Sequence, residues 1–151
     1  MDDIKFIFLS EEEEREIGTY DEFHVTGAAI NRDNECVSIS TQTWSETRNR
    51  FCEECTQHCS WGGIVWTRQD SRGQGIFTNL YFWVKDLAGI DRIYVSKTWD
   101  LHKVLADKYD LHYPKDRSLL ISRAKTKSDL DVAVDLADRI TTMVQSKGGV
   151  W

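Results

Sequence analysis

The chain has 151 residues and a formal net charge of −6, with 25 acidic side chains against 19 Lys and Arg. This length suits one domain with a real core, and an acidic surface repels a nucleic-acid backbone while it attracts a cationic amine. No apolar run reaches the length of a membrane span, and the N-terminus lacks the basic start of a secretory signal. We therefore expect a cytoplasmic protein with no membrane or nucleic-acid partner.

The first part of the chain predicts strands arranged around a hairpin. Residues 5–9 are typical of a strand, and the acidic residues 11–16 fit either a helical turn or a solvated loop. Residues 23–30 and 36–41 alternate apolar and polar side chains on either side of an Asn/Asp cluster, which predicts a β-hairpin. Residues 45–60 contain neither Gly nor Pro, and we expect a helix there.

Cysteines gather in this expected helix. Cys52, Cys55, Cys59 and His58 offer the thiolates and imidazole that zinc prefers, and Cys36 lies upstream. Structural zinc sites usually take cysteine pairs from tight turns, whereas a helical stripe makes these residues small buried hydrophobes. We therefore predict no metal site, and no disulfide in a reducing compartment.

Two His-x-Thr/Ser segments suggest an alternative. His24-Val25-Thr26 and His58-Cys59-Ser60 resemble the paired motifs of two-histidine phosphoesterases, in which two imidazoles act as acid and base on a phosphodiester. The motif needs both copies on strands. Because the second copy lies in the expected helix, we do not favour this alternative.

A glycine-rich turn follows the next expected strand. Residues 62–67 are rich in β-branched and aromatic side chains, and Ser71-Arg72-Gly73-Gln74-Gly75 separates them from a helical pattern over 76–88 that Gly89 ends. Such a turn gathers backbone N–H groups at the positive end of the helix dipole, where they bind anions. This junction predicts a phosphate-bearing cofactor.

Four further elements are expected: a strand at 92–96, a helix at 99–111, a strand at 118–122 and a helix that Ser128 caps. The capped helix packs on the domain or on a second copy through one apolar face, Leu130, Ala133, Val134, Ala137, Ile140 and Val144. Tyr81, Phe82 and Trp83 point in different directions, so they indicate either a contact in a homodimer, a nucleotide-stacking surface or a helix buried on two sides. Residues 147–151 are expected to be a flexible tail.

The order strand, Arg-x-x-Gly turn, helix, strand, helix, strand over residues 62–122 resembles the core of the GCN5-related N-acetyltransferases. This resemblance implies an α/β fold, a mixed twisted sheet flanked by helices, in a single domain over residues 1–146. It also implies acyl transfer from acetyl-CoA, or another acyl-CoA, to an amine acceptor. In that family the turn wraps the cofactor pyrophosphate, and the preceding strand pairs with pantetheine amides. The cofactor-binding residues implied here are Val65, Trp66, Thr67, Arg72, Gly73, Gln74, Gly75, Ile76 and Phe77.

The chain departs from that family at two positions. Phe77 stands where the family keeps Gly or Ala, which would narrow or reshape the cofactor channel. The family's tyrosine, which protonates the departing thiolate, should fall near Val104 and Leu105, and neither can donate a proton. Tyr109 or Ser96 is the candidate catalytic substitute, although Tyr109 could equally close the end of its helix against the core. The rival interpretation is a catalytically silent protein of this fold that acts by binding or inhibiting another protein.

Overall fold

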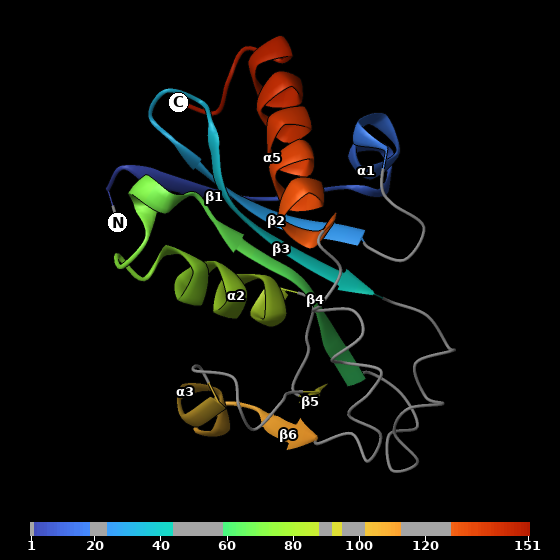
Figure 1. The fold of residues 1–151 in the computed structure, drawn as a ribbon, viewed down its shortest axis with the longest axis vertical. Coiled ribbons are helices and arrows are strands. Elements are labelled where there is room, and N and C mark those ends of the chain that lie inside the picture. The colour runs from blue at the N-terminus through green and yellow to red at the C-terminus, as the bar shows by residue number, and fades with distance from the viewer. Residues whose placement is uncertain (1, 19–23, 44–58, 88–91, 95–101, 113–127) are drawn as a thin grey trace.

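The computed structural model describes residues 2–18, 24–43, 59–87, 92–94, 102–112 and 128–151. These residues form a mixed α/β structure around a six-stranded sheet whose strands follow one another in chain order (Figure 1). Strands β1 to β4 are antiparallel neighbours, whereas β5 and β6 each pair in parallel with the strand before them. The strands are β1 Ile4–Phe8, β2 His24–Asn31, β3 Cys36–Thr43, β4 Cys59–Thr67, β5 Arg92–Tyr94 and β6 Asp110–His112. The helices are α1 Glu11–Ile17, α2 Ile76–Leu87, α3 His102–Ala106 and α5 Ser128–Ser146, with a 3-10 turn, η2, at Gln69–Ser71.

The predicted hairpin is confirmed, and its turn is built by Asn31. The Asn31 side-chain oxygen accepts hydrogen bonds from the backbone N–H groups of Asp33 at 3.0 Å and Glu35 at 2.9 Å. Asn34 adopts a φ of 59°, a conformation that Asn tolerates better than most residues. The register places Ala29 opposite Ser38 but Ile30 opposite Cys36, so β3 carries one extra residue next to the turn.

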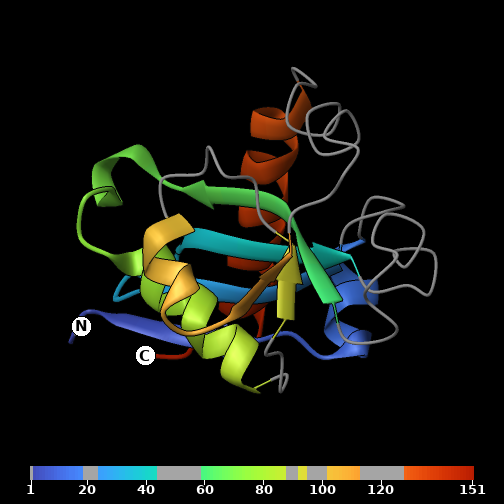
Figure 2. The same ribbon diagram turned by 90° about the horizontal axis from the view of Figure 1, so that it is seen from below.

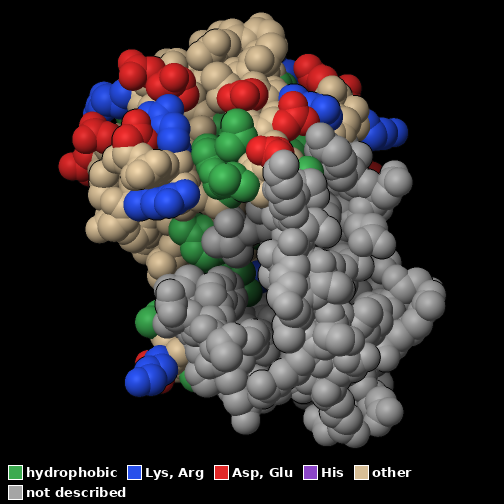
Figure 3. Space-filling view, viewed as in Figure 1, with side chains coloured by type: hydrophobic (Ala, Val, Ile, Leu, Met, Phe, Trp, Pro, Cys, Tyr) green, Lys and Arg blue, Asp and Glu red, His purple; other side chains and the backbone are tan. Residues whose placement is uncertain are grey.

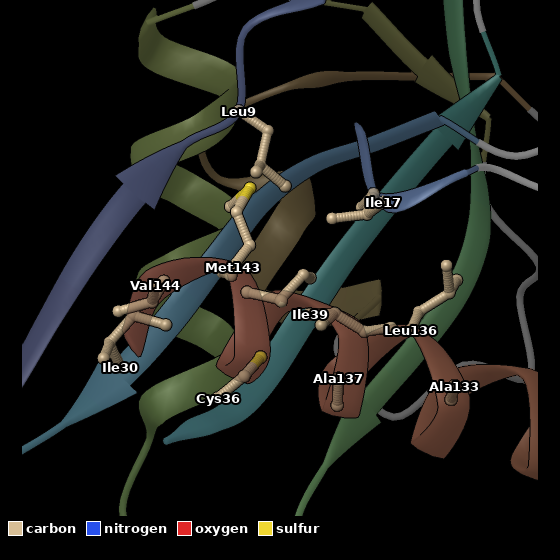
Figure 4. Close-up of a cluster of buried hydrophobic side chains, with 12 residues drawn as sticks. Leu9, Ile17, Ile30, Cys36, Ile39, Ala133, Leu136, Ala137, Met143 and Val144 are labelled. Carbon is tan, nitrogen blue, oxygen red and sulfur yellow. The ribbon is translucent and has the colours of Figure 1, made fainter. Parts of the chain in front are cut away.

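Helix α5 covers one face of the sheet (Figure 4). Its buried side chains step by three and four residues and meet apolar residues of β2, β3 and the segment around α1; the cluster is Leu9, Ile17, Ala28, Ile30, Cys36, Ile39, Ala133, Leu136, Ala137, Ile140, Met143 and Val144. The predicted apolar face is wrong at two positions, because Leu130 and Val134 are 57% and 41% exposed. Consecutive helical residues lie about 100° apart, so a buried stripe centred on Ile140 leaves Leu130 and Val134 on its flank.

Helix α2 covers the other face, and the sheet lies between α2 and α5 (Figure 2). Ile76, Leu80 and Val84 of this helix are buried against the sheet, where they meet Ala29 and Val37. Gly27 lies directly under the helix, since a Cβ atom there would overlap Val84. Glycine at this position lets α2 approach β2 closely.

Of the two alternatives for the acidic residues 11–16, the structure shows the helix, and α1 begins with a capping box. The Ser10 hydroxyl accepts from the Glu13 backbone N–H at 3.1 Å, and the Glu13 carboxylate accepts from the Ser10 backbone N–H at 3.1 Å. Lys147, just after α5, lies 3.6 Å from the Glu13 carboxylate and 3.2 Å from that of Glu16. Figure 3 shows side chains of both charges gathered over this part of the surface. Both ion pairs link α1 to the residue that follows α5.

The C-terminal residues are docked, so the expected flexible tail at 147–151 is wrong. The Asn34 side-chain oxygen accepts from the backbone N–H groups of Val150 at 2.8 Å and Trp151 at 3.2 Å. The indole N–H of Trp151 donates to the Ile30 carbonyl at 3.2 Å, and the ring lies 4.5 Å from both Lys5 Nζ and Arg32 Cζ. The tail is ordered because its polar groups find partners on the hairpin.

The second half of the chain corrects two predictions. The helix expected over 99–111 ends at Ala106, and Asp110–His112 instead form β6, which pairs with β5. Cys59 and Ser60 belong to β4 rather than to a helix, because pairing with β5 overrides their local pattern. The prediction that this His-x-Ser segment lies in a helix is therefore wrong for Cys59 and Ser60. The rest of the helix expected at 45–60, the strand expected at 118–122, Gly89 and Ser96 lie outside the described residues.

Candidate functional site

The predicted turn lies between the end of β4 and the start of α2, and its glycines are required by conformation. Gly73 and Gly75 have φ values of 79° and 73°, which side-chain-bearing residues rarely adopt. A Cβ atom on Gly73 would meet nothing within 4 Å, and residues 72–75 are exposed. The turn therefore exposes its backbone to solvent.

The backbone donors of this turn have no partners inside the described part of the chain. No hydrogen bond there uses the N–H groups of Gly73, Gln74, Gly75 or Ile76, while the Gly75 carbonyl accepts from Asn79 N at 3.1 Å. The first N–H groups of a helix lack internal acceptors, and they carry the positive end of the helix dipole. The turn is thus an exposed set of donors suited to an anion.

Two arginines beside the turn have different partners. Arg68 binds Asp70 at 2.7 Å and lies 3.4 Å from Glu35, so two carboxylates offset its charge. Hydrogen bonds from Asn31 and then Arg68 lower the pKa of Glu35, and the hydrogen bond from Arg68 lowers the pKa of Asp70. The Arg72 Nε donates instead to the backbone carbonyl of Thr67 at 2.9 Å. In the described residues no carboxylate pairs with Arg72, which leaves its positive charge at the turn.

The strand that leads into the turn has an open edge. β3 pairs with β4 from Trp61 to Thr67, but β5 pairs with β4 only from Cys59 to Trp61. Among the described residues no strand continues this second side, and Figure 2 shows β4 turning away from β5 beyond that point. Within the described residues, positions 62–67 therefore have an unpaired backbone edge that suits a pairing ligand.

The direction of the backbone groups follows from the ladder at the end of β4. Arg68 N donates to the Val37 carbonyl on β3 at 2.7 Å. Alternate residues of a strand direct their N–H and C=O groups to opposite edges, so Trp66 engages β3 while Val65 and Thr67 face the open edge. The bond from Arg72 to the Thr67 carbonyl fits this assignment. The buried Ser38 hydroxyl donates to the Trp66 carbonyl at 2.8 Å and fixes the end of the strand against β3.

The structure brings the predicted cofactor residues 65–67 and 72–77 together at one end of β4 and α2. The side chain of Ile76 is only 2% exposed and packs in the core, so only its backbone faces the turn. Phe77 is half-buried, with its ring 5.8 Å from that of Tyr81. Phe77 therefore belongs to an aromatic cluster beside the turn.

That cluster contains Tyr109, the predicted proton donor. Tyr109 is 6% exposed, and its ring lies edge-on to Tyr81 at 6.3 Å and stacked on Phe82 at 5.7 Å. Its hydroxyl is buried and has no hydrogen-bond partner in the described part of the chain. Burial, and then the nearby Asp86 carboxylate, raise the pKa of Tyr109 above its ordinary value, so the phenol keeps its proton at neutral pH. A buried hydroxyl with no partner is costly, so its presence calls for an explanation.

The position of Tyr109 differs from the prediction. It lies beyond the end of α3 rather than one turn further along it, although its N–H still donates to the Leu105 carbonyl at 2.9 Å. Leu105 is buried and Val104 is 46% exposed, so no donor stands at the position where the resembled family has one. The expected alternatives for the three aromatics also narrow. Tyr81, Phe82 and Trp83 each have a ring partner within the chain, which favours a helix buried on two sides.

Sequence reasoning missed the contacts that fix this region. The link from Arg68 to Glu35 and the bond from Ser38 to Trp66 depend on the β3–β4 register. The signal available was an acidic residue in the hairpin turn and an arginine just after the next strand. Only the register between β3 and β4 shows that this arginine, Arg68, lies close to Glu35.

Comparison with known proteins gives a distant structural likeness. No protein-family model matches the chain, and no curated protein matches it. The fold is similar to a crystal structure described as a possible acetyltransferase from Clostridium difficile 630, with 23% identity and a TM-score of 0.40. The likeness covers 60% of this chain and 61% of that one, and at this level it establishes no activity. Within the described residues, no helix is long and apolar enough to cross a membrane.

Proposed function

We propose that this chain is a divergent GCN5-related N-acetyltransferase that transfers an acyl group, most simply acetyl, from coenzyme A to an amine. The observation that supports this proposal is the coincidence of two features at one end of β4. An open backbone edge at residues 62–67 runs directly into a turn whose N–H groups have no partner in the described residues. A ligand with an amide-bearing arm and a phosphate group would use both features together.

Each part of the cofactor has a matching set of groups. The N–H groups from Gly73 to Ile76 would bind the pyrophosphate, with the helix dipole and the Arg72 charge adding to the attraction. Val65 and Thr67 would pair with the pantetheine amides, as an added strand pairs with a sheet edge. Trp66 holds the strand in place through its bonds to β3.

The reaction requires little covalent help from the protein. The neutral amine nitrogen attacks the thioester carbonyl and a new C–N bond forms. The C–S bond breaks to release a thiolate, which takes up a proton from the donor, and the proton that the nitrogen gives up restores the donor. Holding the two reactants in line supplies much of the rate. Tyr109 is the candidate proton donor because its hydroxyl is unpartnered in the described residues and its ring belongs to the aromatic cluster beside the turn. Ser96 is the other candidate donor. The acceptor is an amine, which the net negative charge of the chain attracts.

A thermal shift measurement tests cofactor binding first. A ligand that binds only the folded state raises the melting temperature by mass action, so acetyl-CoA at about a hundred times its Kd adds about 2.7 kcal/mol of stability. Acetate and free pantetheine at the same concentration are the controls. No shift with acetyl-CoA or any other acyl-CoA would contradict the proposal.

A second candidate function is binding without transfer. The observation that favours it is the buried Leu105 at the position where the family has a proton donor, with Tyr109 displaced beyond the helix. The protein would then bind acyl-CoA, or a protein partner, without turnover. Acyl-CoA binding with no release of free coenzyme A in the presence of a panel of amines would support this function over the first.

A further inference from the structure

Arg72 occupies part of the open edge of β4. Its Nε donates at 2.9 Å to the Thr67 carbonyl, which is the last carbonyl that β4 directs to that edge. An amide N–H of a pantetheine arm that paired with this end of the strand would need the same acceptor. The guanidinium therefore competes with such a ligand for Thr67.

We infer that Arg72 covers the cofactor edge in the free protein and that a phosphate group at the turn draws it away. The site would then select thioesters of coenzyme A over thioesters that carry pantetheine without phosphate. This inference rests on the proposed function and adds the residue that sets the ligand class.

The surroundings of Arg72 allow both positions. Its side chain is exposed, and the next residue, Gly73, has a positive φ and no atom within 4 Å of the space that a Cβ would fill. Arg68, only four residues earlier, is held by Asp70 and Glu35 and cannot move as freely. Arg72 thus has room to turn toward an anion.

The energetic preference follows from the two partners. A carbonyl is a neutral acceptor, whereas phosphate carries full negative charge and accepts two parallel bonds from one guanidinium. A phosphate-bearing ligand therefore offsets the loss of the bond to Thr67. A neutral pantetheine thioester replaces that bond at the Thr67 carbonyl with its own amide bond but offers the displaced guanidinium no charged partner.

The test compares two ligands on two matched variants. Arg72→Met keeps an unbranched apolar side chain and removes the guanidinium, and Arg68→Met removes one positive charge from the same region without freeing the Thr67 carbonyl. Calorimetry measures the affinity of acetyl-CoA and of S-acetylpantetheine for the wild type and both variants, with circular dichroism to confirm folding.

Arg72→Met should bind S-acetylpantetheine about two- to tenfold more tightly than wild type, because one competing hydrogen bond is gone. The same variant should bind acetyl-CoA about tenfold more weakly, since a charge-assisted bond to phosphate is lost. Arg68→Met should not tighten S-acetylpantetheine.

S-acetylpantetheine affinity that is unchanged, lower or still undetectable in Arg72→Met would overturn the inference while acetyl-CoA binding to the wild type leaves the proposed function standing. Tightening by both variants would also overturn it, because general charge would then be the cause. Failure of the wild type to bind any acyl-CoA would remove the proposed function and the inference together.

Discussion

The ends of α2 and α5 use similar glycine turns for opposite purposes. After α5, Gly148 and Gly149 have φ values of 92° and 82°, and the N–H groups that follow bind Asn34. Before α2, Gly73 and Gly75 have φ values of 79° and 73°, and their N–H groups have no partner in the described residues. The turn after α5 is closed by the chain's own carbonyls and by Asn34, whereas the turn before α2 is exposed.

The difference extends to the residues around each turn. Trp151, beside the turn after α5, donates its indole N–H to the Ile30 carbonyl, and its ring contacts Lys5 and Arg32. Tyr109, which packs against α2, has a hydroxyl with no partner in the described part of the chain. Buried polar groups normally find partners, so the Tyr109 hydroxyl is a feature to test by mutation.

The largest expected effect is on turnover, through Tyr109 in the aromatic cluster beside the turn before α2. Tyr109→Phe keeps the ring packing on Tyr81 and Phe82 and removes only the hydroxyl. If this phenol protonates the leaving thiolate, turnover should fall by about 10²-fold to 10⁴-fold with unchanged acyl-CoA affinity. Stability of the free protein should not fall, because the hydroxyl it loses had no partner. Steady-state kinetics and urea unfolding measure the two quantities, and wild-type turnover in this variant would exclude Tyr109 as the donor.

On the closed side, Trp151→Ala should destabilise the protein by about 2–3 kcal/mol. The variant loses a half-buried ring, its contacts with Lys5 and Arg32 and one hydrogen bond. The matched control is Leu87→Ala, which truncates a side chain that is 58% exposed and should change stability by less than about 0.5 kcal/mol. Urea unfolding that gives equal values for the two variants would mean that the tail is not docked.

A smaller effect is expected for Asn34→Gly. Glycine keeps the positive φ of this position while it deletes the oxygen that binds two tail N–H groups. We expect a loss of about 1–2 kcal/mol in the free energy of unfolding, with faster amide exchange at Val150 and Trp151. Asp33→Gly, in the same turn, is the control. Unaltered exchange at the tail would show that Asn34 does not hold it.

The smallest effect is a pH dependence of the free energy of unfolding that Tyr109 causes. The pKa of Tyr109 is higher in the folded state than in the unfolded state. The resulting contribution to stability is complete at pH values below the unfolded tyrosine pKa of about 10, where the phenol is neutral in both states. This contribution is lost as the pH rises above that value. Wild type should therefore lose more stability than Tyr109→Phe between about pH 9 and 11, as measured by chemical denaturation. Parallel curves for the two proteins would argue against a buried, unpartnered phenol.

The sequence predicted best those elements whose signal is local. The hairpin follows from the Asn-rich turn and the alternating strands beside it, and α2 follows from the apolar spacing after Gly75. The glycine turn between β4 and α2 was predictable because glycines mark the junction of a strand and a helix, while anion binding by this turn stays a prediction. These features need no knowledge of distant partners.

The features it missed depend on contacts between distant segments. Trp151 docks on Ile30 and Asn34, more than a hundred positions earlier, so a short glycine-rich end gave no sign of order. Cys59 joins β4 because β5 pairs with it, and α3 stops at Ala106 because the chain must return to the sheet at Asp110. The edge of β4 that is unpaired in the described residues was equally hidden, since it depends on how far β4 overlaps with β5.

The central claim is that the turn before α2 is a phosphate site and the turn after α5 is not. The most direct test is acetyl-CoA calorimetry on wild type, Gly75→Val and Gly148→Val. Both variants place a β-branched residue at a positive φ with no close backbone around it, and each should lose about 1–2 kcal/mol of stability. We predict that Gly148→Val binds acetyl-CoA like wild type and that Gly75→Val shows no measurable binding. Equal affinity of wild type and Gly75→Val would contradict the account.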